Sequence, residues 1–281
     1  MVEEYICLEI LPGIEGSSSL YGLLSLFPIA GAEELEHAVR VYIPTGTWQE
    51  IQPTVTQLLN CYGFAFQVVS HTEVQDWYRI WLEQLHPVWL TEDTVVHPFP
   101  EPPQPELYGT ARDILHIVPG TAFGTGHHAT TRLAARLLLQ YLYPSTEWLD
   151  AGTGSGILAI LAARRGANHV YAVDNNPGAL EQARFNIVQN GVAERITVIL
   201  ADLEQAELPR VDGIVANLHA ELLTRLSHRF LQVLRDGGVC VVSGILSPLA
   251  SHVMEAFQEA GFHYEISLCE DEWISFAFRK W

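Results

Sequence analysis

Several features that mark particular protein classes are missing from this chain of 281 residues. Its four cysteines lie far apart and form no C-x-x-C pair, which argues against a zinc site and against a disulfide framework. No apolar run reaches the length of a membrane span, and the first residues, MVEEYICLEI, hold no basic segment of the kind that opens an export signal. We therefore expect a cytoplasmic protein with buried free thiols, no metal site and no membrane partner.

Basic residues are also scarce. There are 33 acidic residues against 15 lysines and arginines, a formal net charge of −18, which disfavours DNA as a direct partner. The imbalance is concentrated in residues 1–100, where Arg40 and Arg79 are the only basic side chains. The acidic residues 1–100 would attract a basic macromolecule. Acidity that only keeps the protein soluble explains the composition equally well.

The first 70 residues predict a small α+β domain. Strands are expected at residues 5–12, 35–44 and 64–70, and helices at 17–27 and 48–63, with room for one more short strand between the helices. This order, without a glycine-rich loop, is typical of a ferredoxin-like sandwich. Because residues 1–70 carry no catalytic constellation, we predict that they recognise the substrate.

Residues 71–106 are predicted to connect this domain to a second one. Apolar side chains recur every four positions on one face of a helix expected over residues 74–90, namely Trp77, Trp81 and Leu85. Five prolines between residues 98 and 105 then exclude regular structure. The catalytic domain is accordingly placed at residues 107–281, and the helix either packs both domains together or moves as a lever.

The clearest chemical signal is the stretch WLDAGTGSGILAIL from Trp148 to Leu161. An apolar strand is followed by D-x-G-x-G-x-G and then by a regular helix. Glycines in such a turn let a ligand lie against bare backbone at the N-terminus of the helix. The residues that form the pattern are Asp150, Gly152, Gly154 and Gly156.

Two cofactors fit a loop of this kind. The dinucleotide fingerprint G-x-G-x-x-G needs its third glycine at position 157, where this chain has Ile157. Asp174 ends the next predicted strand and suits the ribose diol of either cofactor. The carboxylate of Asp150 would repel a pyrophosphate but tolerates a cationic sulfonium. These features favour S-adenosylmethionine over NAD, with a βα turn that binds nothing as the remaining interpretation.

A second glycine-rich segment, IVPGTAFGTGHHATTR, precedes the first strand of the ligand domain. It can close over a bound cofactor, and Thr130 or Thr131 is expected to cap the helix that follows. His127 and His128 are the only adjacent histidines in the chain and can relay a proton. Loop histidines that merely hydrogen-bond to the backbone are an equally good interpretation.

Polar residues also follow later strands. Asp202 ends a third predicted strand, where it either faces an adenine or lies on the surface. Asn217 ends a fourth, at the carboxyl edge where parallel strands form a ligand crevice, and its amide can position an attacking amine without carrying charge. A fifth strand and a terminal antiparallel pair complete the prediction, an α/β fold with the Rossmann-like seven-stranded sheet of class I methyltransferases.

Five motifs make the chain resemble the bacterial PrmA family of methyltransferases: AFGTGHHATT from Ala122, LDAGTGSGILAI from Leu149, VDNNP from Val173, VANLHAEL from Val215 and SGIL from Ser243. The resemblance covers residues 117–246 and is weaker in the front half. It implies an S-adenosylmethionine-dependent enzyme that methylates lysine ε-amines of ribosomal protein L11. We expect this enzyme to be a monomer. The N-terminal amine of that protein is a further target that the resemblance raises.

The resemblance also assigns roles to residues. Many members have GTGTHPTT where this chain has GTGHHATT, so His128, which both forms share, is favoured over His127 as a catalytic residue beside Asn217. Asn175 and Asn176 follow Asp174 where many members have D-x-D, and one carboxylate is enough for both ribose hydroxyls. The complete set of predicted cofactor-binding residues is Phe123, Gly124, Thr125, Gly126, Thr131, Asp150, Gly152, Gly154, Gly156, Asp174, Asn175, Asp202 and Asn217.

Overall fold

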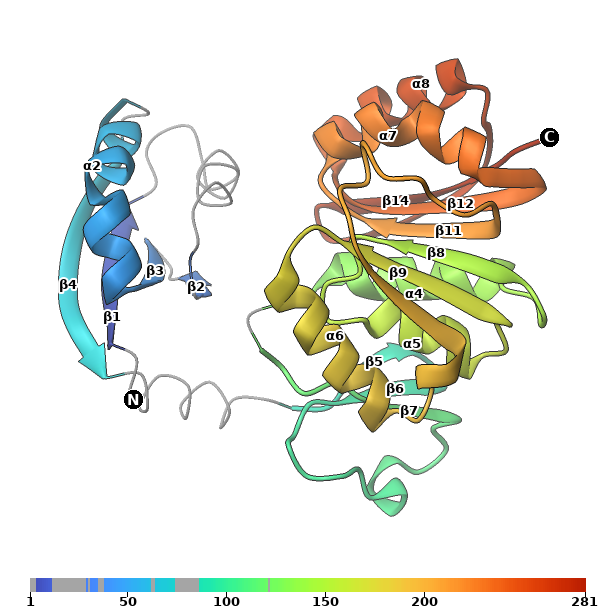
Figure 1. Ribbon diagram of the computed structural model, residues 1–281, viewed down its shortest axis with the longest axis horizontal. Helices are drawn as coiled ribbons and strands as arrows, with labels where there is room; N and C mark the ends of the chain where they lie inside the picture. Colours follow the sequence, from blue (N-terminus) through green and yellow to red (C-terminus); the bar gives the residue numbers. More distant parts are fainter. Residues whose placement is uncertain are drawn as a thin grey trace. The chain divides into compact units, whose positions relative to one another are not determined.

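The structure is a computed structural model of the chain (Figure 1). It describes residues 4–11, 29, 31–34, 38–61, 64–73, 86–120 and 122–281. The chain divides into two compact units, residues 1–85 and residues 86–281. Each unit has its own hydrophobic core.

The first unit is built on a four-stranded antiparallel sheet. Its strands lie in the order β2-β3-β1-β4, with bounds Glu4–Leu11 (β1), Gly31–Glu34 (β2), Val39–Pro44 (β3) and Ala65–Glu73 (β4). The helix α2 (Thr45–Cys61) packs on β1, β3 and β4, burying alternate side chains such as Leu8 and Val41 with Leu59. This order, with the short strand β2, is the one expected of a ferredoxin-like fold. The helix predicted over residues 17–27 lies outside the described residues.

The second unit begins at His86 rather than at residue 107. A small sheet opens it, with β5 (Val88–Thr91) antiparallel to β6 (Thr94–His97) and β6 parallel to β7 (Asp113–His116). The helix predicted over residues 74–90 is therefore wrong at its C-terminal end, because Val88 begins a strand. Pro87 also disfavours a helical conformation of the residue that precedes it. The rest of that helix, with its tryptophans, lies outside the described residues.

A seven-stranded sheet forms the centre of the second unit. Its order is β10-β9-β8-β11-β12-β14-β13, with β14 antiparallel to both of its neighbours. The bounds are Glu147–Ala151 (β8), His169–Asp174 (β9), Ile196–Leu200 (β10), Val211–Asn217 (β11), Leu234–Leu246 (β12), His263–Glu270 (β13) and Trp273–Arg279 (β14). This confirms the predicted sheet of class I methyltransferases.

Helices cover both faces of this sheet (Figure 1). One layer contains α4 (Ala129–Tyr141), α5 (Ile157–Arg164) and α6 (Pro177–Gln189), and the other contains α7 (Ala220–Val233) and α8 (Ala250–Ala260). Neighbouring strand residues face opposite layers: Trp148 packs toward α4 and α5, and Leu149 packs toward α7. Short 3₁₀ helices lie at Pro105–Tyr108 (η1), Ala193–Arg195 (η2) and Ser247–Leu249 (η3).

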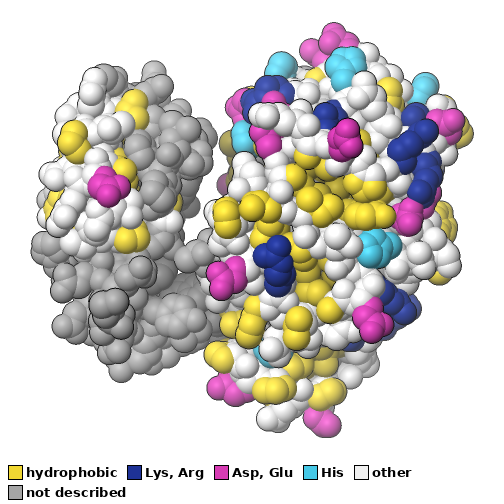
Figure 2. All heavy atoms as spheres, in the orientation of Figure 1, with side chains coloured by type: hydrophobic (Ala, Val, Ile, Leu, Met, Phe, Trp, Pro, Cys, Tyr) yellow, Lys and Arg dark blue, Asp and Glu magenta, His cyan; other side chains and the backbone are white. Residues whose placement is uncertain are grey.

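The surface of the second unit is mixed. Figure 2 shows apolar side chains gathered across its middle in this view, with charged side chains around them. The exposed apolar residues include Phe185 and Val188 of α6 and Leu200 of the edge strand β10. Cys240 is a buried thiol as predicted, whereas Cys269 is exposed because β13 is an edge strand. None of the described helices is long and apolar enough to cross a membrane.

Candidate active site

The glycine loop between β8 and α5 has the backbone conformation that its sequence predicts. Gly152, Gly154 and Gly156 have φ angles of +76°, +53° and +84°, a region that side chains disfavour. A Cβ at Gly152 would lie 2.4 Å from the side chain of Leu218, and a Cβ at Gly154 would lie 2.5 Å from the carbonyl oxygen of Phe123. The loop is thus closely packed, and only glycine fits at both positions.

Asp150, at the head of this loop, is 1% exposed. Its Oδ2 accepts hydrogen bonds from Thr153 Oγ1 at 2.7 Å and from the backbone N–H of Ala159 at 3.0 Å, which fixes the loop to the first turn of α5. Its Oδ1 has no hydrogen-bond partner among the described residues. Burial, and to a smaller extent the charge of Asp174, raise the pKa of the Asp150 carboxyl to about 7, against the lowering effect of its two hydrogen bonds. An unpaired buried carboxylate oxygen is suited to a cationic ligand.

Asp174, the last residue of β9, lies at the edge of the same loop. Its Oδ2 accepts from the N–H of Gly154 at 3.0 Å, and its Oδ1 accepts from the N–H of Asn176 at 2.9 Å. Asn176 in turn caps α6 by accepting from Gly178 N–H at 2.8 Å. The carboxylate is therefore held in place and keeps a lone pair on each oxygen for a diol. Asn175 is exposed beside it.

The predicted covering segment lies directly on the glycine loop. The carbonyl of Phe123 accepts from the N–H of Ser155 at 2.9 Å, and the carbonyl of Gly124 accepts from Ser155 Oγ at 2.6 Å. A Cβ at Gly126 would come within 2.9 Å of Val96, so the segment also packs against the β5–β6 hairpin. The side chain of Phe123 remains 57% exposed. This contact depends on Ser155, which the sequence did not single out.

His128 caps α4, where the sequence predicted Thr130 or Thr131. Its Nδ1 accepts from the Thr130 N–H at 3.3 Å and lies 2.8 Å from Thr130 Oγ1, which assigns the ring proton to Nε2. Burial lowers the pKa of His128, and the charge of Arg132 lowers it further. The ring is therefore neutral at pH 7, with one nitrogen already engaged. A catalytic role for His128 stays a prediction.

Two aromatic rings meet His128 edge-on. The ring of Phe123 lies 5.5 Å from it and that of Trp273 lies 4.8 Å from it, measured between centroids. Trp273 was not predicted as a site residue, because only the pairing of β12 with β14 brings it to this edge of the sheet. His127 points elsewhere: its Nδ1 lies 3.3 Å from Thr125 Oγ1, its ring meets His86 at 5.0 Å, and burial lowers its pKa.

Asn217 ends β11 and turns toward α4. Its Nδ2 donates to Thr131 Oγ1 at 3.4 Å, and Thr131 is fully buried. On the next strand, Ser243 Oγ donates to the carbonyl of Thr130 at 2.7 Å and accepts from Ser275 Oγ at 2.6 Å. These bonds connect β11, β12 and β14 to the start of α4. The sequence placed Asn217 and Thr131 in one site but gave no sign of their mutual contact.

Asp202 lies beyond the end of β10 and is exposed. Its Oδ1 accepts from Glu204 N–H at 2.8 Å, and its Oδ2 accepts from Gln205 Nε2 at 2.9 Å. The carboxylate is thus engaged in a local turn, and a contact with adenine stays a prediction. The other predicted residues gather at the carboxyl ends of β8, β9 and β11, where the fold leaves backbone donors and two acidic side chains for a ligand.

The family of this chain follows from its similarity to known proteins. The family model described as ribosomal protein L11 methyltransferase (PrmA) matches residues 30–281. The chain belongs to the PrmA family. This confirms the resemblance that five motifs carried, and extends it into the first unit.

Relatives and a solved structure agree with this membership. The ribosomal protein L11 methyltransferase of Gloeobacter violaceus is 37% identical over 203 residues, which are 72% of this chain and 62% of that protein, less than two thirds of its length. That of Anoxybacillus flavithermus is 31% identical over 251 residues, 86% and 80% of the two chains. The crystal structure of a ribosomal protein L11 methylase from Lactobacillus delbrueckii subsp. bulgaricus matches with a TM-score of 0.65 at 31% identity, covering 70% of this chain and all of that one.

Proposed function

We propose that this protein is an S-adenosylmethionine-dependent N-methyltransferase that acts in the cytoplasm on lysine ε-amines of ribosomal protein L11. The observation that carries the proposal is the glycine loop, which combines an unpaired oxygen of buried Asp150 with a docked covering segment. The acceptor protein is inferred from the relatives, which are ribosomal protein L11 methyltransferases. The N-terminal amine of L11 is a second target of the same chemistry.

The residues around the loop fit this cofactor better than a dinucleotide. Asp174 offers two fixed carboxylate oxygens for a ribose diol, and Asp150 offers one buried oxygen for a positive charge. A pyrophosphate beside Asp150 would place like charges together in a site of low dielectric constant. When bound, S-adenosylmethionine supplies an electrophilic methyl group on a sulfonium.

Asn217 and the covering segment orient the acceptor. Because Nδ2 of Asn217 already donates to Thr131, its Oδ1 is left to accept a hydrogen bond from an incoming amine. With the substrate bound, Phe123 and the neighbouring aromatic rings would exclude water from the reacting nitrogen, and desolvation favours the neutral amine, which alone has a lone pair. Neutral His128 does not need to act as a base in this scheme. Positioning then supplies much of the rate.

The test is methyl transfer by the purified protein with labelled cofactor and purified ribosomal protein L11. Mass spectrometry of the product is expected to find methyl groups on lysine side chains. Absence of transfer to any lysine or to the N-terminus would refute the proposal. Transfer to another protein or to a small molecule, with L11 unmodified, would keep the cofactor and replace the acceptor.

A further inference from the structure

A cavity lies at the C-terminal ends of α5 and α6, remote from the candidate active site. It has a volume of about 340 Å³, and its lining includes Arg112, Arg164, His116 and Asn190. Helix α5 begins directly after the glycine loop and ends at Arg164. Its eight residues span about 12 Å at 1.5 Å per residue, so this cavity is separate from the cofactor loop.

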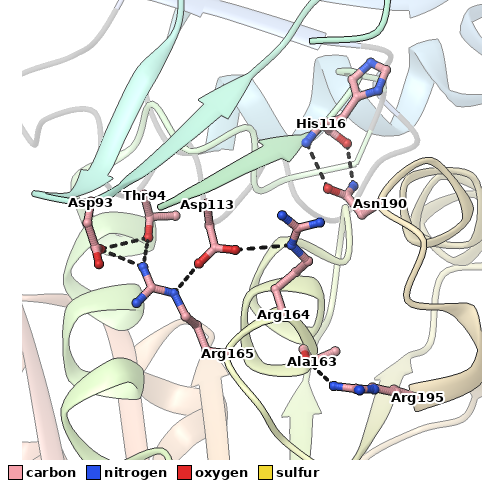
Figure 3. Close-up of polar contacts among 9 residues, drawn as sticks. All are labelled: Asp93, Thr94, Asp113, His116, Ala163, Arg164, Arg165, Asn190 and Arg195. Atoms are coloured by element: carbon pink, nitrogen blue, oxygen red, sulfur yellow. Dashed lines mark hydrogen bonds and ion pairs between the residues drawn. The ribbon is translucent and has the colours of Figure 1, made fainter. Parts of the chain in front are cut away.

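Two guanidinium groups with unused donors line the cavity. The side chain of Arg112 makes no hydrogen bond or ion pair with any described residue, although its backbone N–H bonds to Asp93. Arg164 binds Asp113 through Nε at 3.2 Å, and Figure 3 shows its two terminal nitrogens extending past that carboxylate toward the side of His116 and Asn190. None of the described lining residues is acidic, which is notable in a chain of net charge −18.

The acceptors beside the cavity are already engaged. Asp113 binds Arg164 through Oδ1 and Arg165 through Oδ2, the latter at 2.5 Å. Asn190 accepts from the N–H of His116 at 2.9 Å and donates Nδ2 to the carbonyl of His116 at 2.7 Å. Figure 3 shows both groups of contacts. Arg164 therefore keeps donors that Asp113 cannot satisfy.

The negative ends of the two helices are also capped. At the end of α5, the carbonyl of Ala163 accepts from Arg195 Nη1 at 3.2 Å. At the end of α6, the carbonyls of Asn186 and Val188 accept from Asn190 Nδ2 at 2.7 Å and Gly191 N–H at 3.0 Å. These bonds reduce the exposed negative charge that helix C-termini otherwise present to a ligand.

The walls of the cavity are held in place before any ligand binds. His116 is 4% exposed, and its Nε2 donates to the carbonyl of Phe99 at 2.8 Å. Pro103 and Ile114 supply an apolar part of the lining. A pocket with a fixed apolar wall, the partly held guanidinium of Arg164 and the exposed guanidinium of Arg112 suits a small anion that carries organic substituents.

We propose that this cavity binds a phosphate group, either as inorganic phosphate or as a small phosphate monoester. Planar guanidinium groups match phosphate oxygens in two-point contacts, and Arg112 adds a positive charge that no described carboxylate compensates, beside the free donors of Arg164. The apolar wall favours the monoester. The proposal is independent of the methyltransferase activity, because it concerns the opposite ends of α5 and α6.

Isothermal titration calorimetry of the full chain at fixed ionic strength tests the proposal with inorganic phosphate and ribose 5-phosphate as probes. Saturable binding is expected, and Arg112→Gln and Arg164→Gln should each weaken it about tenfold or more, as expected for the loss of charge-assisted hydrogen bonds. Arg225→Gln is the control, since Arg225 forms an exposed pair with Glu204 at 2.8 Å. Tighter binding of ribose 5-phosphate identifies the monoester, and equal binding identifies the free anion.

Thermal unfolding of the variants separates loss of the ligand from loss of the fold. Arg112 has no ionic partner among the described residues, so Arg112→Gln is expected to unfold at the wild-type temperature even if Arg164→Gln does not. Absence of saturable binding to the wild type overturns the proposal. So does binding that Arg112→Gln leaves unchanged.

Discussion

Asp150 makes the stability of the ligand-free protein depend on pH. Its folded pKa of about 7 lies above the ordinary 3.8, so the protonated form favours folding. That contribution is complete below pH 3.8 and is lost as pH rises through about 7. Asp150→Asn keeps an acceptor for Thr153 and Ala159 but cannot ionise. We expect its free energy of unfolding to change less between pH 4 and pH 8 than that of the wild type, by about 1 to 4 kcal/mol.

Urea unfolding of the ligand-free proteins across this pH range measures the difference. Parallel profiles for the wild type and Asp150→Asn would mean that the carboxyl ionises as it does in water. The control is Asp236→Asn, because Asp236 is exposed and its pair with Lys280 spans 3.3 Å.

Asp174 is expected to contribute to cofactor affinity through both carboxylate oxygens. Asp174→Ala removes the proposed diol contact and also the acceptor for the Gly154 N–H. We expect S-adenosylmethionine to bind about 1.5 to 3 kcal/mol more weakly, the range for charge-assisted hydrogen bonds. Calorimetric titration measures this, with Asp236→Ala as the surface control. Wild-type affinity in Asp174→Ala would remove Asp174 from the site.

At the scale of elements, the contact between the glycine loop and the covering segment can be tested with a pair of alanine variants. Gly154→Ala places a Cβ 2.5 Å from the Phe123 carbonyl at a φ of +53°. Gly109→Ala introduces the same kind of backbone strain at a φ of +55°, with nothing within 4 Å. We expect Gly154→Ala to weaken cofactor binding at least tenfold beyond Gly109→Ala, because it displaces the covering segment. Equal affinities would show that this docking is irrelevant to binding.

Ser243 connects the start of α4 to the central strands. Ser243→Ala removes its bond to the Thr130 carbonyl and leaves Ser275 Oγ without its acceptor in the fully buried interior. We expect a loss of stability of about 1 to 3 kcal/mol and a turnover number reduced more than cofactor affinity, because the Thr131–Asn217 contact depends on α4. Ser275→Ala, which keeps the Thr130 bond, is the matched variant and should affect turnover less. Equal effects on turnover would contradict this account.

Local patterns explain which parts of the site the sequence predicted. The spacing of Gly152, Gly154 and Gly156 and the position of Asp174 are fixed within short segments, so periodicity and loop chemistry were sufficient. The N-cap of α4 was predicted wrongly because threonine is a common N-cap and histidine is not. The helix begins at Ala129, so His128 occupies the N-cap position. Trp273 reaches the site through pairing of distant strands, which no local pattern encodes.

For the whole molecule, the fold class was predictable and the boundary between units was not. Alternating strands and helices specified the seven-stranded sheet, whereas the proline-rich stretch suggested a domain edge that lies inside the second unit. The prolines follow β6, and buried His97 anchors them by donating Nε2 to the Glu101 carbonyl at 2.7 Å. Proline is disfavoured in the interior of helices and sheets, but a run of prolines does not mark a domain boundary, and Pro105 begins the 3₁₀ helix η1 inside the second unit.

The uneven charge predicts a salt effect on the proposed substrate capture. Residues 1–100 hold Arg40 and Arg79 as their only lysine or arginine side chains, so a basic substrate protein would be attracted at long range. Raising ionic strength shortens the screening length below roughly 8 Å. We expect the KM for L11 to rise severalfold between low and high salt, with little change in kcat. Steady-state kinetics measure this, and a KM that is independent of salt would assign the acidity to solubility.

The position of β14 has a consequence for biosynthesis. This strand follows β13 in the chain but lies between β12 and β13 in the sheet. During translation, β13 therefore emerges before the strand that joins it to the sheet, while β12 presents an unpaired, apolar edge. Closing the sheet must await the residues from Trp273 onward. A nascent chain stalled before Trp273 is expected to recruit chaperones or aggregate, however well β8 to β12 have already assembled.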